Sequence, residues 1–223
     1  MHSRFLVAIA CTVGPILGCT AALPIGANCR SPLDSRIANS CVVADEELWR
    51  GARPDPKAAA TLVDLGVQTV VSLELLQTDI QAFEEAKPIS SVSREIQYFQ
   101  IRDWEPLVVV APDVVDEHVA HFLALTRTQP APIYVHCRSG QNRTGVMVAA
   151  YRILHGADIE KTIEEMEKYG GFWSKQDASY IRSLTPQRRS AIEERIAAWI
   201  PRLKRSAKVL CAEGKCTVSV DAI

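Results

Sequence analysis

A cysteine and an arginine with five residues between them are the side chains of this chain best suited to chemistry on a phosphate group. Cys137 and Arg143 lie within the segment His136-Cys-Arg-Ser-Gly-Gln-Asn-Arg-Thr-Gly145. A loop of this length can turn its backbone N–H groups towards phosphate oxygens, and a helix that follows it adds the positive end of its dipole. Arg143 offers a planar fork that can bind two of those oxygens. The spacing therefore predicts a phosphate cradle with a nucleophilic thiol at its base.

Other residues of the segment suit the same chemistry. Gly140 allows a backbone turn that a side chain would resist. The positive charges around the loop favour the nucleophilic thiolate form of Cys137. Thr144 can donate a hydrogen bond to that thiolate when it leaves, and His136 is placed to support the loop from behind.

Apolar periodicity outlines the elements that must hold this loop. A short apolar strand at 133–136 precedes it, and an apolar helix from about 143 to 154 follows it. Asp55 and Pro56 predict the start of a helix that ends at Gly66. The other expected elements are strands at 67–73 and 96–101, a weaker helix at 77–87, and helices at 113–128, 158–169 and 187–204. Strands that alternate with helices predict an α/β fold of three layers, with a central, mostly parallel sheet of four to five strands flanked by helices.

The His-Cys-x5-Arg-Thr pattern between His136 and Thr144 resembles the signature loop of the protein tyrosine phosphatase superfamily. The compact layout of roughly residues 46–170 is similar to the dual-specificity phosphatases, including bacterial ones. The resemblance implies a double displacement through a phosphocysteine, with no metal and no cofactor. It implies that Cys137 is the nucleophile, Arg143 the phosphate clamp and Thr144 the hydroxyl of the loop. The residues that it places around the bound phosphate are Arg138, Ser139, Gly140, Gln141 and Asn142.

The resemblance also requires a general acid, which protonates the leaving oxygen and then activates water. In compact members of the superfamily this aspartate lies about thirty residues before the cysteine, on a loop that follows a strand. Asp103 fits that description, and the neighbouring Trp104 could pack as a lid. Glu105, Asp113 and Asp116 are rivals, although Asp113 is better explained as a helix N-cap and Asp116 lies inside the same helix.

Two other functions share part of this pattern. A rhodanese-type sulfurtransferase also carries a cysteine loop, but that loop is usually one residue shorter and needs no acid. A non-catalytic phosphate-binding module usually lacks the cysteine, the arginine or the acid, and all three are present here. Within phosphatases, Arg138 is the only extra cation of the loop, which favours phosphotyrosine, mixed phosphoprotein substrates or small phosphate esters. Inositol phosphates and phosphoinositides, whose loops tend to carry several cations, remain the alternative.

Bulk composition sets limits on the class of protein. The chain has 223 residues, of which 48% are apolar, so one domain with a substantial core is expected. The formal charge of −1 offers no general attraction for nucleic acid.

The first residues read as an export signal. Arg4 precedes an apolar run at 5–17, which is short for a membrane span and typical of a signal peptide. Ile16-Leu17-Gly18-Cys19 resembles a lipoprotein cleavage site, which implies a signal peptide at 1–18, a lipid on Cys19 and a membrane-anchored protein of the periplasm or cell envelope. Ordinary cleavage after Ala21 or Ala22 is the rival interpretation. The expected parts after this are a linker or N-terminal extension at 19–45, the phosphatase domain at 46–205 and a C-terminal tail at 206–223.

The cysteine count agrees with export. Of seven cysteines, Cys11 lies in the apolar run and Cys19 is the lipid site, which leaves an odd number with one reactive thiol. Local pairing favours the disulfides Cys29–Cys41 and Cys211–Cys216, while the alternative is that all of these cysteines are reduced and buried.

Two further features have ordinary interpretations. Arg50 and Arg53 flank a turn; a surface role is the favoured interpretation, and a part in shaping the pocket is the alternative. Gly170-Gly171-Phe172-Trp173 is interpreted as a helix end with aromatic packing.

Overall fold

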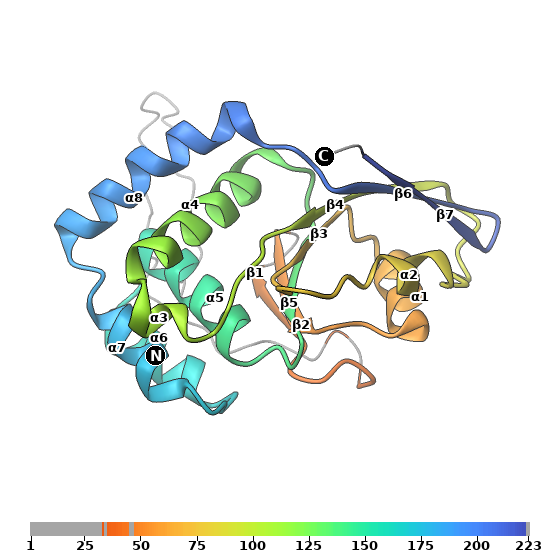
Figure 1. Cartoon of the computed structure of the whole chain (residues 1–223). Coiled ribbons are helices and arrows are strands. Elements are labelled where there is room, and N and C mark those ends of the chain that lie inside the picture. The colour runs from red at the N-terminus through yellow and green to blue at the C-terminus, as the bar shows by residue number, and fades with distance from the viewer. Residues whose placement is uncertain (1–32, 34, 45–46, 222–223) are drawn as a thin grey trace, which may run out of the picture.

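A seven-stranded mixed sheet forms the centre of the protein, which is described by a computed structural model over residues 33, 35–44 and 47–221 (Figure 1). Its strand order is β1-β2-β5-β3-β4-β6-β7. The strands are β1 (Cys41–Ala44), β2 (Leu48–Ala52), β3 (Thr69–Ser72), β4 (Arg94–Gln100), β5 (Ile133–Cys137), β6 (Ala207–Ala212) and β7 (Lys215–Val220).

Four of these strands form a parallel core. β5 pairs in parallel with β2 on one side and β3 on the other, and β3 pairs in parallel with β4. Antiparallel strands extend this core at both edges, with β1 on β2 and the β6–β7 hairpin on β4. The carboxyl ends of parallel strands meet at one edge of a sheet, where ligands bind in folds of this type.

Helices cover both faces of the sheet, as the ribbon in Figure 1 shows. On one face α1 and α2 enclose a core that includes Leu62, Phe83 and Tyr98. On the other face the long helices α4, α5 and α8 enclose a larger core around Phe122 and Met147. The helices are α1 (Pro56–Leu65), α2 (Ile80–Glu84), α3 (Leu107–Val110), α4 (Pro112–Thr128), α5 (Asn142–Leu154), α6 (Ile159–Glu167), α7 (Ser174–Arg182) and α8 (Pro186–Trp199), followed by a 3-10 turn η1 (Ile200–Arg202). The three-layer α/β architecture is the one that the sequence predicts.

Local signals act as expected at α1. The Asp55 side chain accepts a hydrogen bond of 2.8 Å from the backbone N–H of Ala58, which satisfies one donor of the first turn. Gly66 ends the helix with a φ of 100°, a left-handed conformation that suits glycine. The strand before the cysteine loop and the helix after it also form where their apolar runs lie.

The sheet has more strands than the expected four to five, because it extends past both boundaries predicted for the domain. The segment expected as a C-terminal tail forms β6 and β7, and Ala207, Val209 and Cys211 are buried on β4. At the other end, the last residues of the expected linker form β1. These strands lie at the edges of the sheet and bury only alternate side chains, so their apolar pattern is weak.

Two helices differ from the predictions in ways that affect the site. The segment 102–112, between the strand predicted at 96–101 and the helix predicted at 113–128, contains α3, and α7 was not predicted at all. Asp113 is not the N-cap of α4, because the helix already begins at Pro112 with Ala111 in the cap position. Proline is common in the first turn, where its missing N–H has no intrahelical partner to lose.

Several expectations about the termini concern residues outside the described range. The signal peptide, Cys19 and Cys29 lie there. Cys41 is a disulfide cysteine, and Cys211 bonds to Cys216 across the β6–β7 hairpin. Within the described part of the chain, no helix has the length and apolar character needed to cross a bilayer.

Candidate active site

Cys137 lies at the carboxyl end of β5, in the middle of the parallel strands. Its side chain is buried, and it is the free cysteine of the described residues. Residues 138–141 form a loop, and α5 begins at Asn142. The strand, the loop and the helix N-terminus therefore have the arrangement that the spacing of Cys137 and Arg143 predicts.

Donors from the neighbouring β2 region hold the carbonyl groups of the loop. Asn39 Nδ2 donates a hydrogen bond of 2.8 Å to the carbonyl of Ser139, and the backbone N–H of Arg53 donates one of 3.4 Å to the carbonyl of Arg138. The Arg50 guanidinium donates to the carbonyl of Gly140. Because C=O and N–H point in opposite directions in a trans peptide, carbonyls held on the β2 side direct the following N–H groups towards the other side. That is the orientation in which N–H groups can bind an anion.

Gly140 fits where no side chain could. Its φ is 72°, and a Cβ atom there would lie 2.5 Å from the carbonyl carbon of Gly51 and 2.6 Å from the nitrogen of Ala52. The loop backbone therefore packs directly against the backbone of β2, and this contact requires glycine for both space and conformation.

Arg50 is a buried part of this support, and its assignment to the surface is wrong. Its side chain is 1% exposed and its guanidinium lies 3.7 Å from the centre of the Tyr169 ring. Burial lowers the pKa of Arg50, and nearby groups, led by Tyr169 and Cys137, partly oppose that effect. Arg50 lies between Trp49 and Gly51 on a strand, and nothing in this local sequence indicates that it will face a loop ninety residues away.

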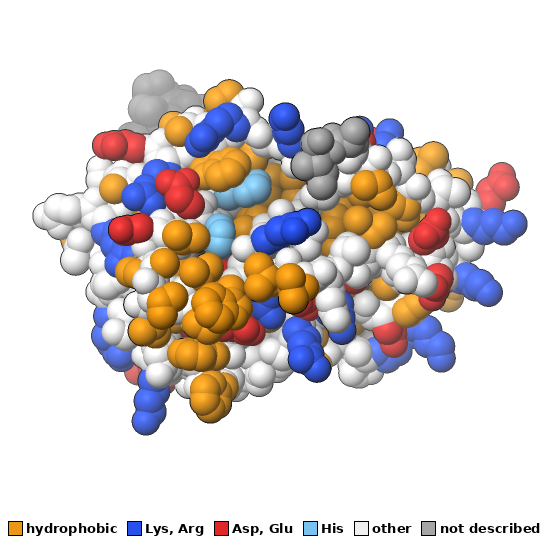
Figure 2. All heavy atoms as spheres, in the orientation of Figure 1, with side chains coloured by type: hydrophobic (Ala, Val, Ile, Leu, Met, Phe, Trp, Pro, Cys, Tyr) orange, Lys and Arg blue, Asp and Glu red, His pale blue; other side chains and the backbone are white. Residues whose placement is uncertain are grey.

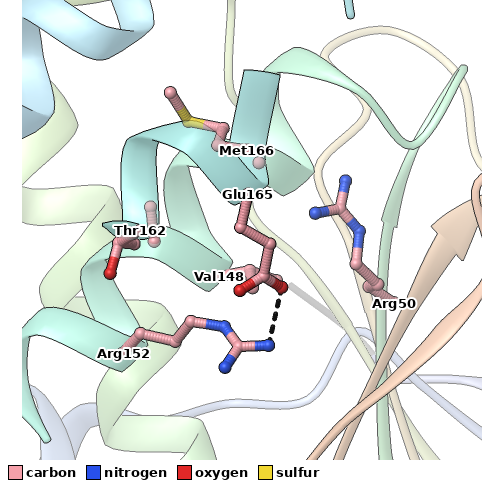
Figure 3. Close-up of a pocket in the computed structure, with 8 residues that line it drawn as sticks. Arg50, Val148, Arg152, Thr162, Glu165 and Met166 are labelled. Carbon is pink, nitrogen blue, oxygen red and sulfur yellow. Dashed lines mark hydrogen bonds and ion pairs between the residues drawn. The ribbon is translucent and has the colours of Figure 1, made fainter. Parts of the chain in front are cut away.

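A small pocket lies behind the loop, between Arg50 and the helices α5 and α6 (Figure 3). Glu165 extends between Arg50 and Arg152 and forms an ion pair of 2.7 Å with Arg152. The centre of a water molecule can occupy about 10 Å³ of this pocket. The pocket therefore has room for about one water. The pocket is therefore part of the charged packing that holds the loop, and it is too small for a substrate.

Arg143 is anchored by the chain segments that follow β3 and β4. Its Nη1 atom donates hydrogen bonds of 2.6 Å to the carbonyl of Leu73 and 3.2 Å to the carbonyl of Asp103. Its Nε atom lies 3.2 Å from a carboxylate oxygen of Glu105, and Nη1 lies 3.8 Å from one of Glu74. These contacts limit the positions of the guanidinium beside the loop, which lowers the entropy cost of binding a phosphate.

The four candidates for the general acid have different surroundings. Asp103 is buried and its carboxylate lies 3.0 Å from Nδ1 of His118 on α4. Glu105 is partly exposed and faces Arg143. Asp116 is held by Tyr180 and Arg188, in a structural contact between α4, α7 and α8.

Asp113, the fourth candidate, is exposed in the first turn of α4. The arrangement therefore brings Asp103 and Glu105 to Arg143, while Asp116 is occupied elsewhere.

The loop after α6 forms another wall of the site, which the interpretation as a simple helix end did not foresee. Gln141 Nε2 donates a hydrogen bond of 2.7 Å to the carbonyl of Tyr169. Gly171 has a φ of 120°, and a Cβ atom there would lie 2.6 Å from the amide of Asn142. The Asn142 amide in turn donates a hydrogen bond of 2.7 Å to Asp177 on α7.

Asp177 is a buried carboxyl group beside the loop that sequence reasoning missed. Burial raises its pKa to about 7; the hydrogen bond from Asn142 opposes this rise, and the negative charges of Glu105 and Asp103 add to it. The carboxyl group therefore titrates near neutral pH beside a loop residue that is expected to bind phosphate. In the sequence Asp177 is simply a polar residue of a short helix, and such residues are usually exposed.

His136 supports the loop from below through a buried polar group. Its Nε2 atom lies 3.2 Å from a carboxylate oxygen of Asp79, and Tyr98 donates a hydrogen bond of 2.5 Å to the other oxygen. Burial alone would raise the pKa of Asp79, but the interactions with His136 and Tyr98 hold it below its usual value. Thr144 is also fully buried, and its Oγ1 atom lacks a hydrogen-bond partner among the described residues.

Comparisons with known proteins agree with this geometry. A protein-family model described as "DSP-PTPase phosphatase fused to NAD+ Kinase" matches residues 33–183. The chain belongs to the dual-specificity branch of the protein tyrosine phosphatase family. It is 32% identical over 140 residues to the dual specificity protein phosphatase TpbA of Pseudomonas aeruginosa, which covers 60% of this chain and 58% of that protein. The chain thus spans less than two thirds of the length of this curated relative.

Solved structures of the same relative share the fold. The crystal structure of P. aeruginosa TpbA matches with a TM-score of 0.56 at 25% identity, over 79% of this chain and 97% of that one. A variant of TpbA has also been crystallised in complex with phosphotyrosine. A second family relative, the inositol diphosphatase DSP4 of Arabidopsis thaliana, is 25% identical over 130 residues, which is 57% of this chain and 62% of that protein. One relative is named as a protein phosphatase and the other as an inositol diphosphatase, so the comparisons leave the substrate of this chain open.

Titration of Asp177 predicts a pH-dependent stability. Its pKa rises from an ordinary value of 3.8 to about 7 on folding, so the folded state binds the proton more tightly. The stabilising contribution is therefore complete below about pH 4 and is lost as the pH rises through 7. Each unit of pKa corresponds to about 1.4 kcal/mol, so we expect wild type to lose a few kcal/mol relative to Asp177→Asn across this range.

Urea unfolding of both proteins from pH 4 to pH 8 measures this difference. The asparagine keeps an acceptor for Asn142 but cannot ionise. Parallel pH profiles of the free energy of unfolding for the two proteins would contradict the assignment.

Proposed function

We propose that this protein is a metal-independent cysteine phosphatase that hydrolyses phosphate monoesters through a phosphocysteine, with phosphotyrosine as its preferred group. The observation that carries the proposal is the loop between β5 and α5. One strand–loop–helix unit carries a buried free thiol, peptide groups oriented by donors from β2, and an anchored arginine. Each of these features suits a tetrahedral dianion, and together they suit its transfer to sulfur.

In the first step the Cys137 thiolate attacks phosphorus, and an S–P bond forms as the P–O bond to the leaving group breaks. Arg143 and the loop N–H groups stabilise the negative charge on the three equatorial oxygens. Asp103 donates its proton to the leaving oxygen. The hydrogen bond between His118 and Asp103 orients that carboxyl group while the proton moves.

In the second step a water molecule attacks phosphorus and gives its proton to Asp103. The S–P bond breaks, inorganic phosphate forms, and the electron pair returns to Cys137. Thr144 has a buried hydroxyl with no other partner among the described residues, so it can donate a hydrogen bond to the departing thiolate.

The charges around the loop support a substrate with one phosphate at the site. Asp103 and Glu105 lie on one side, Glu74 lies beneath Arg143, and Asp177 lies behind Asn142. Arg53 is close to Glu74, at 3.9 Å, so its charge is partly compensated. A polyphosphorylated inositol would bring its additional phosphates close to these carboxylates, whereas phosphotyrosine brings an uncharged ring. These features favour phosphotyrosine over inositol polyphosphates.

We also propose that the chain is exported and carries a lipid on Cys19, which would hold it at the membrane of the cell envelope. The support is the Arg4 and 5–17 pattern before Ile16-Leu17-Gly18-Cys19. Disulfides at Cys41 and between Cys211 and Cys216 are in keeping with an oxidising compartment.

Replacement of the nucleophile tests the mechanism. Cys137→Ser should lower phosphate release by at least about 10³-fold, because a serine hydroxyl is a far weaker nucleophile at neutral pH. The variant should still bind phosphate or vanadate, since the loop and Arg143 are intact. Release of phosphate from p-nitrophenyl phosphate and from a phosphotyrosine peptide, both with EDTA present, provides the measurement. Full activity in Cys137→Ser would sink the proposal.

The leaving group should reveal the general acid. Asp103→Asn should slow hydrolysis of phenyl phosphate by about 10²–10⁴-fold, the usual contribution of a general acid. It should slow p-nitrophenyl phosphate much less, because nitrophenolate leaves readily without a proton. Glu105→Gln and Asp113→Asn are the matched controls. If Glu105→Gln shows this dependence on the leaving group and Asp103→Asn does not, the acid is Glu105.

Metabolic labelling with a palmitate analogue tests the lipid site. Cys19→Ser should remove the label from the full-length protein, whereas Cys11→Ser should retain it because Cys11 lies inside the predicted signal peptide. Equal labelling of both variants would show that Cys19 is not the acceptor.

A further inference from the structure

Large apolar side chains are exposed beside the proposed active site. Figure 2 shows hydrophobic atoms gathered at the lower left of the molecule, over α3 and the loop after α6. We call this surface the apolar rim; its members are Trp104, Val109, Val110, Val114 and Phe172. Phe172 is 89% exposed and Val110 is 66% exposed. Contiguous exposed apolar surface of this kind usually marks a binding site.

The local structure shows that the rim is not a part of the core. The four residues of α3 are Leu-Val-Val-Val; Leu107 and Val108 are partly buried against the core, whereas Val109 and Val110 are exposed. Valine is a poor helix former, so this sequence contributes little to the stability of the helix. Phe172 is positioned by an edge-on contact with Trp173, whose ring centre lies 5.6 Å away. These side chains are thus ordered on the surface but contribute little to the interior.

The rim is continuous with the phosphate site on two sides. Trp104 lies between Asp103 and Glu105, and both of these residues contact Arg143. Phe172 follows Gly171, whose backbone packs on the Asn142 amide. A phosphate bound in the loop would therefore place the atoms next to it against the rim.

The charge of the rim restricts what can bind there. Within the segments 103–114 and 169–173 the charged side chains are the carboxylates Asp103, Glu105 and Asp113, while the cations Arg102, Lys168 and Lys175 lie just outside these segments. An anionic bilayer or a polyphosphate is favoured by cations among its contacts, and the rim itself supplies none. An uncharged apolar peptide segment needs no cation, so this charge pattern favours it as the occupant of the rim.

We propose that the apolar rim binds large apolar side chains that flank phosphotyrosine in a protein substrate, and so selects among phosphoproteins. This inference rests on the proposed function, because it assigns a substrate class to the same site. Burial of one such side chain favours binding by about ten- to a hundredfold, so the sequence around the phosphotyrosine should matter strongly.

Two phosphotyrosine peptides of equal length and charge test the proposal with the full chain. One carries Leu, Ile and Phe on both sides of the phosphotyrosine, and the other carries Ser, Gln and Asn. For each protein, kcat/KM on the peptides is normalised to kcat/KM on p-nitrophenyl phosphate. Wild type should prefer the apolar peptide by at least about tenfold, the effect of one buried side chain.

Variants of the rim should remove that preference. Phe172→Ser and Val110→Ser each should bring the ratio between the peptides close to one. The matched control is Ile89→Ser, because Ile89 is 95% exposed but lies outside the rim, in the segment after α2 and beside α1. That control should keep the preference of wild type.

The other outcomes separate the two proposals. No phosphate release by wild type from any substrate would overturn the proposed function itself. Release without an apolar preference, or a preference that survives both rim variants, would overturn the rim proposal alone.

Two further measurements address other occupants of the rim. Sedimentation of wild type, but not Phe172→Ser, with phosphatidylcholine–phosphatidylglycerol vesicles would assign the rim to lipid and overturn the proposal. Self-association of wild type that Phe172→Ser abolishes would assign it to a second copy and also overturn it.

Discussion

The orientation of the peptide groups between Cys137 and Asn142 is the constraint on which the proposed site depends. An anion cradle requires several consecutive N–H groups on one side, and a free loop would not keep them there. The carbonyls of residues 138–140 are instead held by Asn39, Arg50 and Arg53, which belong to the segment around β2. Because a peptide plane is rigid, fixing the carbonyl also fixes the amide. The energy of preorganisation is thus supplied when the protein folds and not when the substrate binds.

Buried charges maintain this geometry, and each has a compensating partner. The Arg50 guanidinium lies over Tyr169, and Arg143 contacts two carbonyls and two carboxylates. His136 faces Asp79 directly below the loop. Removing one member of such a pair would leave an unpaired charge in the interior, which costs more than the pair itself contributes. The loop is therefore surrounded by a set of mutually dependent contacts from β2, β3, β4 and α7.

The charges around the loop and the apolar rim beside it face different parts of the proposed substrate. In the proposed function the loop binds a single dianion, and the carboxylates around it disfavour further negative charge. Beyond them the surface becomes apolar, at Trp104, the valines of α3 and Phe172. A substrate whose phosphate is attached to an apolar group fits this arrangement, with the phosphate in the loop and the apolar group against the rim.

The layers of the fold and the strand–loop–helix unit that carries Cys137 and Arg143 could be predicted from the sequence. The spacing from Cys137 to Arg143 is a local property, since both residues belong to that one unit, and the cap at Asp55 and the end at Gly66 are local for the same reason. The distant groups that meet the unit could not be predicted, because they depend on the tertiary structure. Arg50, Asp79 and Asp177 come from separate elements, and their burial follows from strand order and helix packing that no nearby residue encodes. The edge strands β6 and β7 were not predicted for a related reason. An isolated hairpin is only marginally stable in water, and this one is stabilised by the pairing of β6 with β4.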